Sequence, residues 1–326
     1  MTKPQLPSLI ESMGLLPLSE RLRQAAVALG GAEDVPPSRF DHSSLNMLNP
    51  RVSVPLWRGK ALVPRTVLLT NLFNHRQTPV EQGWSVRRTQ AEDFRGRRLT
   101  YDSHNGTDLS VPRGTLAVAP APGRVVRVYS EFNRGGNKVI IDHGQGLLTC
   151  SAHLARPLVS EGQELELGQP YALTGYSGLD GFATFPWGVP HIHFNVWLNG
   201  APVDPFSRSA EPSLWVSGAP TPVPVGAAQD RAGPTAYAPD RLAEVVAACK
   251  TPSVRARLEG MDPARLGSYL VSEICYYPTR FPLRDGLQAL EHPRRPRLYL
   301  PFEARDFDGA AFLDELNLRG LILPRE

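Results

Sequence analysis

The middle of this 326-residue chain consists of short runs of alternating apolar residues separated by tight turns. Clusters such as Pro122-Gly123 and Asn133 to Gly136 interrupt the runs, and these residue types favour turns because of their backbone conformations. The pattern predicts an antiparallel, sheet-rich core and not a helical bundle. The expected strands are 115–119, 124–130, 138–142, 147–153, 163–167, 170–175 and 190–198.

Three segments precede this core. Residues 18–30 carry leucine and alanine at helical spacing and end at a Gly-Gly pair, which predicts an amphipathic helix. Residues 52–73 alternate in the manner of strands and are rich in β-branched residues, which predicts a small β element. Residues 76–100 are polar and poorly periodic, so we expect a loop there.

The pattern changes again after the core. Residues 207–239 hold six prolines among small residues, which is typical of a linker or of a chain wrapped over the surface. Beyond them the apolar spacing is helical. We expect one helix capped by Asp240, a second that opens at Asp262-Pro263, and a third over 308–318.

The sequence therefore predicts an α+β fold with an antiparallel, sheet-rich core, an N-terminal helix and β element, and a small helical C-terminal module. The expected parts are residues 1–98, the core domain 99–206, the linker 207–239 and the helical module 240–326.

Charge and composition limit the partners. The net charge is only +3 and the chain has no dense basic block, so we expect no nucleic-acid partner. Three separated cysteines without a CxxC pair indicate reduced thiols. Since there is no apolar run of about 18 residues, we expect no membrane span. Charges interrupt the N-terminal stretch, so it does not resemble a signal peptide. We expect a cytoplasmic protein, or a periplasmic or secreted one if an export segment has been removed.

Two histidines lie two positions apart in the last apolar strand. Because strand side chains alternate, His191 and His193 should project from one face, about 6.6 Å apart at the backbone. Ile192, Phe194 and Val196 would then form the core face of that strand.

Other metal-binding residue types lie upstream. His104 and Asp108 flank an Asn-Gly pair that disfavours a helix, and an extended strand would separate them by about 13 Å. A turn at Gly106 would let them converge on one ion, and His with Asp suits zinc. His153 ends a strand whose other face should carry Cys150. A lone histidine is more often structural, but five such residues within ninety positions favour a metal site.

These residues carry a resemblance to a known family. HNGTD, SAHL and HIHF resemble the H-x-G-x-D motif, the second motif and the H-x-H motif of the M23 zinc metallopeptidases, also called the LytM or lysostaphin type. The three motifs agree with the family in order and spacing. The resemblance covers roughly residues 99–206.

The resemblance implies a site and a reaction. One zinc ion per chain would be held by His104, Asp108 and His193, with His153 and His191 as catalytic histidines beside it. One of the two would accept the proton of the attacking water, while the other stabilises the oxyanion or protonates the leaving amine; which does which stays open. The family implies a β-sheet core with a long groove and peptidoglycan peptide cross-links as substrates.

The chain departs from the family pattern near the site. Asn195 stands where the family usually has glutamate, and the insertion LDGFATFPWGVP precedes the H-x-H motif. Its aromatic residues would line a substrate groove or simply pack on the domain, and a tyrosine before the first motif is a candidate hydrogen-bond donor to the oxyanion. The candidate groove residues are Tyr101, Phe182, Phe185 and Trp187.

Three functions fit the sequence. The first is a zinc-dependent endopeptidase that acts on peptidoglycan. The second is an intracellular zinc amide or peptide hydrolase with another substrate, and the third is a non-catalytic LytM-like regulatory or interaction module. Residues 1–98 would shield or shape one end of the groove, with Asn71 or Asn74 in the open metal position of a latent form. Removing residues 1–98 should then raise activity, whereas a drop would mean that the segment is structural.

Overall fold

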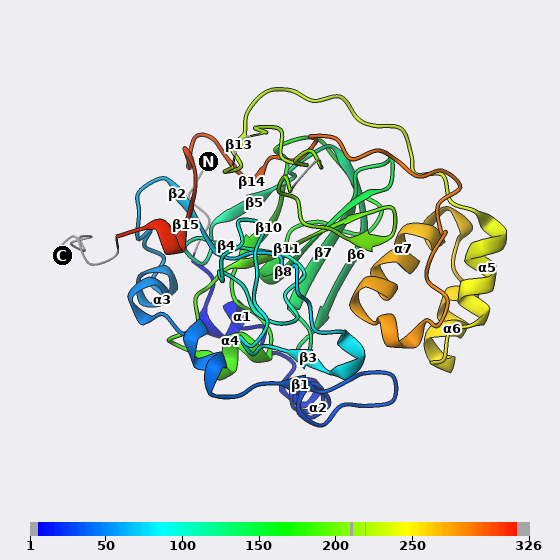
Figure 1. Cartoon of the computed structure of the whole chain (residues 1–326), viewed down its shortest axis with the longest axis horizontal. Helices are drawn as coiled ribbons and strands as arrows, with labels where there is room; N and C mark the ends of the chain where they lie inside the picture. The colour runs from blue at the N-terminus through cyan, green and yellow to red at the C-terminus, as the bar shows by residue number, and fades with distance from the viewer. Residues whose placement is uncertain (1–5, 209–210, 219, 318–326) are drawn as a thin grey trace.

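The computed structural model describes residues 6–208, 211–218 and 220–317, and its fold is mixed α and β with a sheet at the centre (Figure 1). One sheet of 11 strands runs through the molecule, with the main order β15-β2-β4-β11-β8-β7-β6-β9. Its strands are β2 (Thr66–Asn71), β4 (Thr107–Ser110), β5 (Leu116–Val118), β6 (Gly123–Glu131), β7 (Gly136–Asp142), β8 (Leu147–Pro157), β9 (Glu164–Leu165), β10 (Pro170–Thr174), β11 (Ile192–Leu198), β12 (Ala201–Pro202) and β15 (Gly309–Phe312).

All seven strands expected between residues 115 and 198 are confirmed, with differences at their ends. The sheet also takes in both flanks of this region. β2 pairs with β4 in antiparallel register, and β15 pairs with β2 in parallel register. The division of the chain into four parts remains a prediction, and the sheet contains strands from three of those parts.

The N-terminal predictions are confirmed only in part. The expected helix is α2 (Leu18–Gly30), and the strand half of the 52–73 prediction is β2. The first half was wrong, because it forms the helix α3 (Pro50–Trp57). There a proline starts the helix, and Val52 and Leu56 lie four apart on its buried face, so burial at helical spacing outweighs the strand propensity of β-branched residues.

Three helices follow the proline-rich stretch: α5 (Pro239–Ala247), α6 (Pro252–Glu259) and α7 (Pro263–Tyr276). Asp262 caps α7 as predicted, since its side chain accepts a hydrogen bond from the Ala264 amide at 2.9 Å. Asp240 does not cap α5. The helix begins at Pro239, one residue before Asp240, so Asp240 lies in the first turn. There its carboxylate still interacts favourably with the helix dipole.

The third helix expected over 308–318 was wrong. Gly309–Phe312 form β15, and a short 3-10 turn, η4 (Leu313–Glu315), follows; residue 318 lies outside the described residues. The backbone of β15 finds hydrogen-bonding partners on β2, and this tertiary pairing overrides the helical spacing of the sequence. The remaining short elements are α1 (Leu9–Ser12), α4 (Leu179–Thr184), β1 (Ser38–Arg39), β3 (Trp84–Ser85), β13 (Pro224–Val225), β14 (Leu300–Glu303), η1 (His42–Met47), η2 (Val80–Gln82) and η3 (Pro278–Arg280).

Both faces of the sheet are buried. Ile192, Phe194 and Val196 belong to one apolar cluster, as predicted, and β14 and β5 contribute to the same cluster. The opposite face carries Cys150 and Trp197, which pack against α5, α6 and α7; these helices lie together at the right of Figure 1. His193 shares the parity of Trp197, so it projects on the side of the sheet that the helices cover. Within the described ranges, no helix is both long and apolar enough to cross a membrane.

Candidate metal centre

Two central strands place an aspartate opposite a histidine. β4 and β11 are antiparallel neighbours, and their register pairs Asp108 directly with His193. Opposed residues on neighbouring strands project to the same face, so the two side chains meet. Nδ1 of His193 lies 2.9 Å from Oδ1 of Asp108. Both side chains are buried.

His104 reaches the same point from the bend before β4. Its Nε2 lies 3.0 Å from Oδ1 of Asp108 and 3.1 Å from Nδ1 of His193. The bend needs glycine for space. A Cβ atom on Gly106 would lie 2.9 Å from the His193 imidazole and 2.9 Å from the main-chain oxygen of Phe194.

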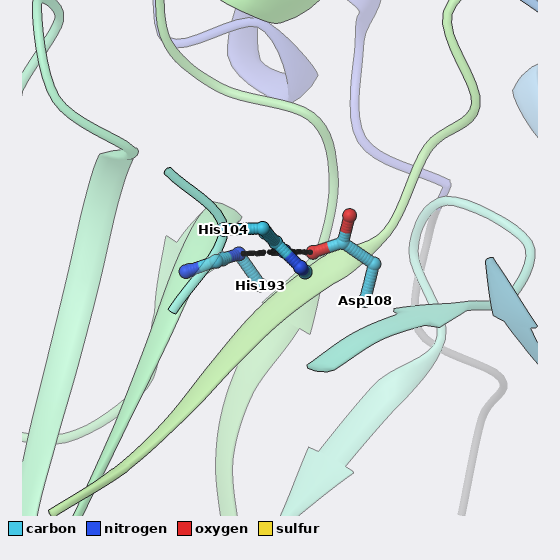
Figure 2. A group of neighbouring side chains, drawn as sticks. All are labelled: His104, Asp108 and His193. Atoms are coloured by element: carbon cyan, nitrogen blue, oxygen red, sulfur yellow. Dashed lines mark hydrogen bonds and ion pairs between the residues drawn. The ribbon is translucent and has the colours of Figure 1, made fainter. Parts of the chain in front are cut away.

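The three side chains point toward one another, as Figure 2 shows. Their potential ligand atoms all lie within 4.8 Å of each other. A tetrahedral zinc ion with bonds of about 2.0–2.1 Å would hold neighbouring ligand atoms about 3.3 Å apart. The observed separations of 2.9–3.1 Å are slightly shorter, so a small outward movement of the side chains would seat the ion.

Hydrogen bonds behind the histidines leave acceptor atoms facing the centre. Nδ1–H of His104 donates to the Leu72 carbonyl at 2.6 Å, so Nε2 of the neutral ring carries a lone pair. Nε2–H of His193 faces Oδ1 of Asn105 at 3.3 Å, which leaves the lone pair on Nδ1. Burial lowers the pKa of His193 and so favours this neutral ring. Two imidazole lone pairs and a carboxylate oxygen of Asp108 therefore converge, and such a donor set fits a divalent cation.

Asn71 holds the second oxygen of Asp108. Its Nδ2 donates to Oδ2 at 2.8 Å. Burial opposes ionisation of Asp108, but the electrostatic interaction with the neighbouring imidazoles of His104 and His191 holds the pKa of this carboxyl well below its usual range. Asn74 instead donates to main-chain carbonyls of the loop before β4. A latent form that involves either asparagine stays a prediction.

A β-bulge brings His153 to the site. In an unbroken strand His153 would share the face of Ser151, on the opposite side of the sheet from His193. Between Ser151 and Leu154, however, β8 uses one residue more than its partner β7, and His153 has a φ of 60°. The extra residue turns the ring toward the site, where its centre lies 4.9 Å from that of His191.

The two remaining histidines are both anchored through Nδ1. Nδ1–H of His153 donates to the Ser177 carbonyl, and Nδ1–H of His191 donates to the Val189 carbonyl, each at 2.7 Å. Both rings therefore keep Nε2 as the acceptor, and Nε2 of His191 lies 3.5 Å from Oδ1 of Asp108. Burial, reinforced by the neighbouring imidazole of His191, holds the pKa of His153 well below its usual value.

Tyr176 belongs to the site but was not predicted from the sequence. Its ring centre lies 5.1 Å from that of His153 and 4.7 Å from that of His191. It also stacks on Trp57 of α3. The sequence gives only a weak signal for this role, an aromatic residue directly after a strand, because the contact with α3 depends on the fold.

Tyr101 lies beside the cluster of His104, Asp108 and His193, with its ring centre 4.4 Å from that of His104. Burial, reinforced by the Asp108 carboxylate, raises the pKa of Tyr101 well above its usual value. The phenol therefore stays protonated and can donate a hydrogen bond.

The three aromatic residues of the insertion lie on or just after α4. Phe182 and Trp187 are exposed, at 53% and 54%, and Phe185 is 37% exposed. Phe185 meets Trp57 edge-on at 5.2 Å, so it extends the row of rings that begins at Tyr176. Their exposure is compatible with a groove lining, which stays a prediction.

Comparisons with known proteins match the middle of the chain to one family of peptidases. The model of peptidase family M23 matches residues 102–205. An uncharacterized metalloprotease of Haemophilus influenzae is 35% identical over 104 residues, which are 32% of this chain and 20% of that protein. The peptidoglycan DD-endopeptidase ShyA of Vibrio cholerae is 33% identical over 132 residues, 39% of this chain and 28% of that protein.

Among solved structures, a zinc-containing peptidase from Vibrio cholerae is 30% identical with a TM-score of 0.32, covering 43% of this chain and 38% of that one. This chain spans less than a third of the length of the two curated relatives. The matched segment contains all three motifs, from His104 to the H-x-H pair, and residues 102–205 of this chain therefore belong to peptidase family M23.

Proposed function

We propose that this protein is a zinc-dependent endopeptidase that hydrolyses peptide cross-links of peptidoglycan. The convergence of Nε2 of His104, Oδ1 of Asp108 and Nδ1 of His193 carries the proposal, because three acceptors that meet in a buried site fit a metal ion. The DD-endopeptidase name of the Vibrio cholerae relative supports the substrate class.

The histidines and the aspartate of the site divide into two groups by their proposed roles. His104, Asp108 and His193 would hold one zinc ion, leaving a coordination position open. When bound, zinc would polarise a carbonyl and lower the pKa of a water molecule. His153 and His191 each offer an unprotonated Nε2 beside the cluster, so one can accept the proton of water and the other can assist the oxyanion or the leaving amine. Tyr101 is a further donor candidate for the oxyanion.

The proposed substrate bears on location. Peptidoglycan lies outside the cytoplasm. The proposed substrate therefore requires a periplasmic or secreted protein and is inconsistent with the expected cytoplasmic location. Cell fractionation with antibody detection would decide between the two.

The metal is tested by elemental analysis of protein purified without chelator. We expect about one zinc per chain, lost in His104→Ala and in His193→Ala and kept in His42→Ala, whose side chain is exposed and outside the site. Wild-type protein that holds no zinc would contradict the proposal.

The reaction is tested by amine release from purified peptidoglycan sacculi. His191→Ala should keep its zinc but lose roughly 100-fold to 10,000-fold in kcat, since a general acid or base contributes about that much. Wild type that cleaves other peptides but not sacculi would favour the zinc amide hydrolase. Zinc without any cleavage would favour the non-catalytic module.

A further inference from the structure

The hydrogen bonds around His193 continue into a helix outside the family segment 102–205. Nε2–H of His193 faces Oδ1 of Asn105 at 3.3 Å. The side-chain amide of Asn195 donates to Oδ1 and to the main-chain oxygen of Asn105, each at 2.9 Å. The hydroxyl of Tyr276, the last residue of α7, donates to Oδ1 of Asn195 at 3.2 Å. An unbroken chain of hydrogen bonds thus joins α7 to a ligand histidine.

The contacts in this series of hydrogen bonds together determine which atoms donate and which accept. The two hydrogens of the Asn195 amide are taken by the two oxygens of Asn105. The Asn195 nitrogen also lies 3.1 Å from Nε2 of His193, but both of its hydrogens are already engaged. Nε2 of His193 therefore carries its own hydrogen, which faces Oδ1 of Asn105. Because the amide nitrogen of Asn195 is engaged in this way, its oxygen accepts from Tyr276.

Packing fixes the ring of Tyr276. The ammonium of Lys138 lies 4.2 Å from the ring centre, and Trp197 meets the ring edge-on at 5.9 Å. The hydroxyl also contacts Sγ of Cys150 at 3.3 Å. Because Tyr276 is only 7% exposed, its hydroxyl has little freedom to turn away from Asn195.

We propose that Tyr276 is a positioning residue of the metal centre, which acts through Asn195 and Asn105 to fix the ring orientation and tautomer of His193. The inference rests on the proposed function, because it takes Nδ1 of His193 as a zinc ligand. Outer partners of a ligating histidine hold its ring and set which nitrogen carries the hydrogen. The C-terminal helices are then part of the metal centre.

The test uses the 326-residue chain with Tyr276→Phe, which removes only the hydroxyl. Zinc affinity is measured by competition with a chromophoric chelator, and the site geometry by the absorption spectrum of the cobalt-loaded protein. We expect zinc affinity to fall about tenfold, as is typical for the loss of an outer partner of a ligand, and the cobalt bands to change.

Tyr171→Phe is the matched control. Tyr171 is also buried, and its hydroxyl contacts Ser151 at 2.6 Å on the opposite face of the sheet from the site. Both variants should lower the melting temperature of the metal-free protein, but Tyr171→Phe should leave zinc affinity and the cobalt spectrum unchanged. Equal zinc affinity in wild type and Tyr276→Phe would overturn the inference while leaving the proposed function intact.

Asn195→Ala and the double variant test whether the effect passes through Asn195. Asn195→Ala should weaken zinc binding at least as much as Tyr276→Phe, and adding Tyr276→Phe to it should cause no further loss. If the two losses multiply, Tyr276 acts by another route and the inference fails. Should Tyr276→Phe not fold, unchanged zinc affinity in Asn195→Ala would overturn it. Wild type that binds no zinc would overturn the inference and the proposed function together.

Discussion

At the scale of residues, burial decides the protonation of histidines even outside the site. His143 follows β7 and is 1% exposed. Its Nδ1–H donates to the Pro122 carbonyl at 3.0 Å, and its Nε2 lies 2.9 Å from Oγ1 of Thr149. Burial lowers the pKa of His143 to about 4.

This pKa predicts a loss of stability in acid. An unfolded histidine has a pKa of about 6.5, so between pH 4 and 6.5 the unfolded state binds more protons and the free energy of unfolding falls as the pH drops. The free energy of unfolding that is lost in this way in acid is fully present above pH 6.5, and the share due to His143 amounts to about 3 kcal/mol. In metal-free protein, His143→Asn should reduce the stability lost between pH 7 and pH 4 by about this amount, measured by urea denaturation. The same pH dependence in both proteins would show that His143 is not its source.

At the same scale, the residue types of the site followed from the sequence but the position of His153 did not. Strand alternation placed Cys150 and His153 on opposite faces. Cys150 is buried as expected, yet it lies on the face of Trp197 and the helices, which is also the face of His193. His153 reaches that face only through the bulge in β8, and sequence alternation does not reveal an extra residue in a strand.

At the scale of elements, β2 links the N-terminal region to the site. It lies between β15 and β4, and its register pairs Leu69 with Leu109, both fully buried. The strand ends at Asn71, which holds Asp108. The N-terminal region therefore supports Asp108 and the candidate metal centre through the sheet.

We accordingly expect the chain without residues 1–98 to lose activity, because the truncation removes a strand from the sheet. Circular dichroism and amine release from sacculi would measure the loss. Within the full chain, Leu69→Ala should cost about 2–5 kcal/mol in the free energy of unfolding. Leu22→Ala is the control, since Leu22 is 65% exposed and its substitution should cost about 0.5 kcal/mol or less. Truncated protein that is folded and more active would instead support a latent form.

At the scale of the whole molecule, an ionic cluster around the buried carboxylate of Glu273 fastens the helices to the sheet. Oε1 of Glu273, on α7, lies 2.8 Å from the guanidinium of Arg127 on β6 and 2.8 Å from that of Arg257. Oε2 lies 3.2 Å from Arg280. Glu273 is 1% exposed and precedes Tyr276 by about one helical turn. Its ion pairs therefore also help to fix the position of Tyr276 relative to the sheet.

Glu273→Gln should destabilise the protein by about 3–5 kcal/mol, because the buried charge of Arg127 loses its partner. Urea denaturation measures this effect, and the chelator competition should show weaker zinc binding in the same variant. Glu81→Gln is the control, since its pair with Arg284 is half exposed and should contribute about 1 kcal/mol or less. Equal losses in the two variants would contradict a special role for the buried cluster.

The sequence by itself determined the features that are local along the chain. The strand runs from 115 to 198 and the cap at Asp262 could be predicted, because periodicity and spacing depend on neighbouring residues. The motifs likewise named the five candidate site residues, whose roles stay predictions. The tertiary structure decided the bulge at His153, the strand at β15 and the reach of Tyr276 to Asn195, which are 81 residues apart. Such contacts depend on strand register and on the packing of distant segments, and residue spacing along the chain encodes neither.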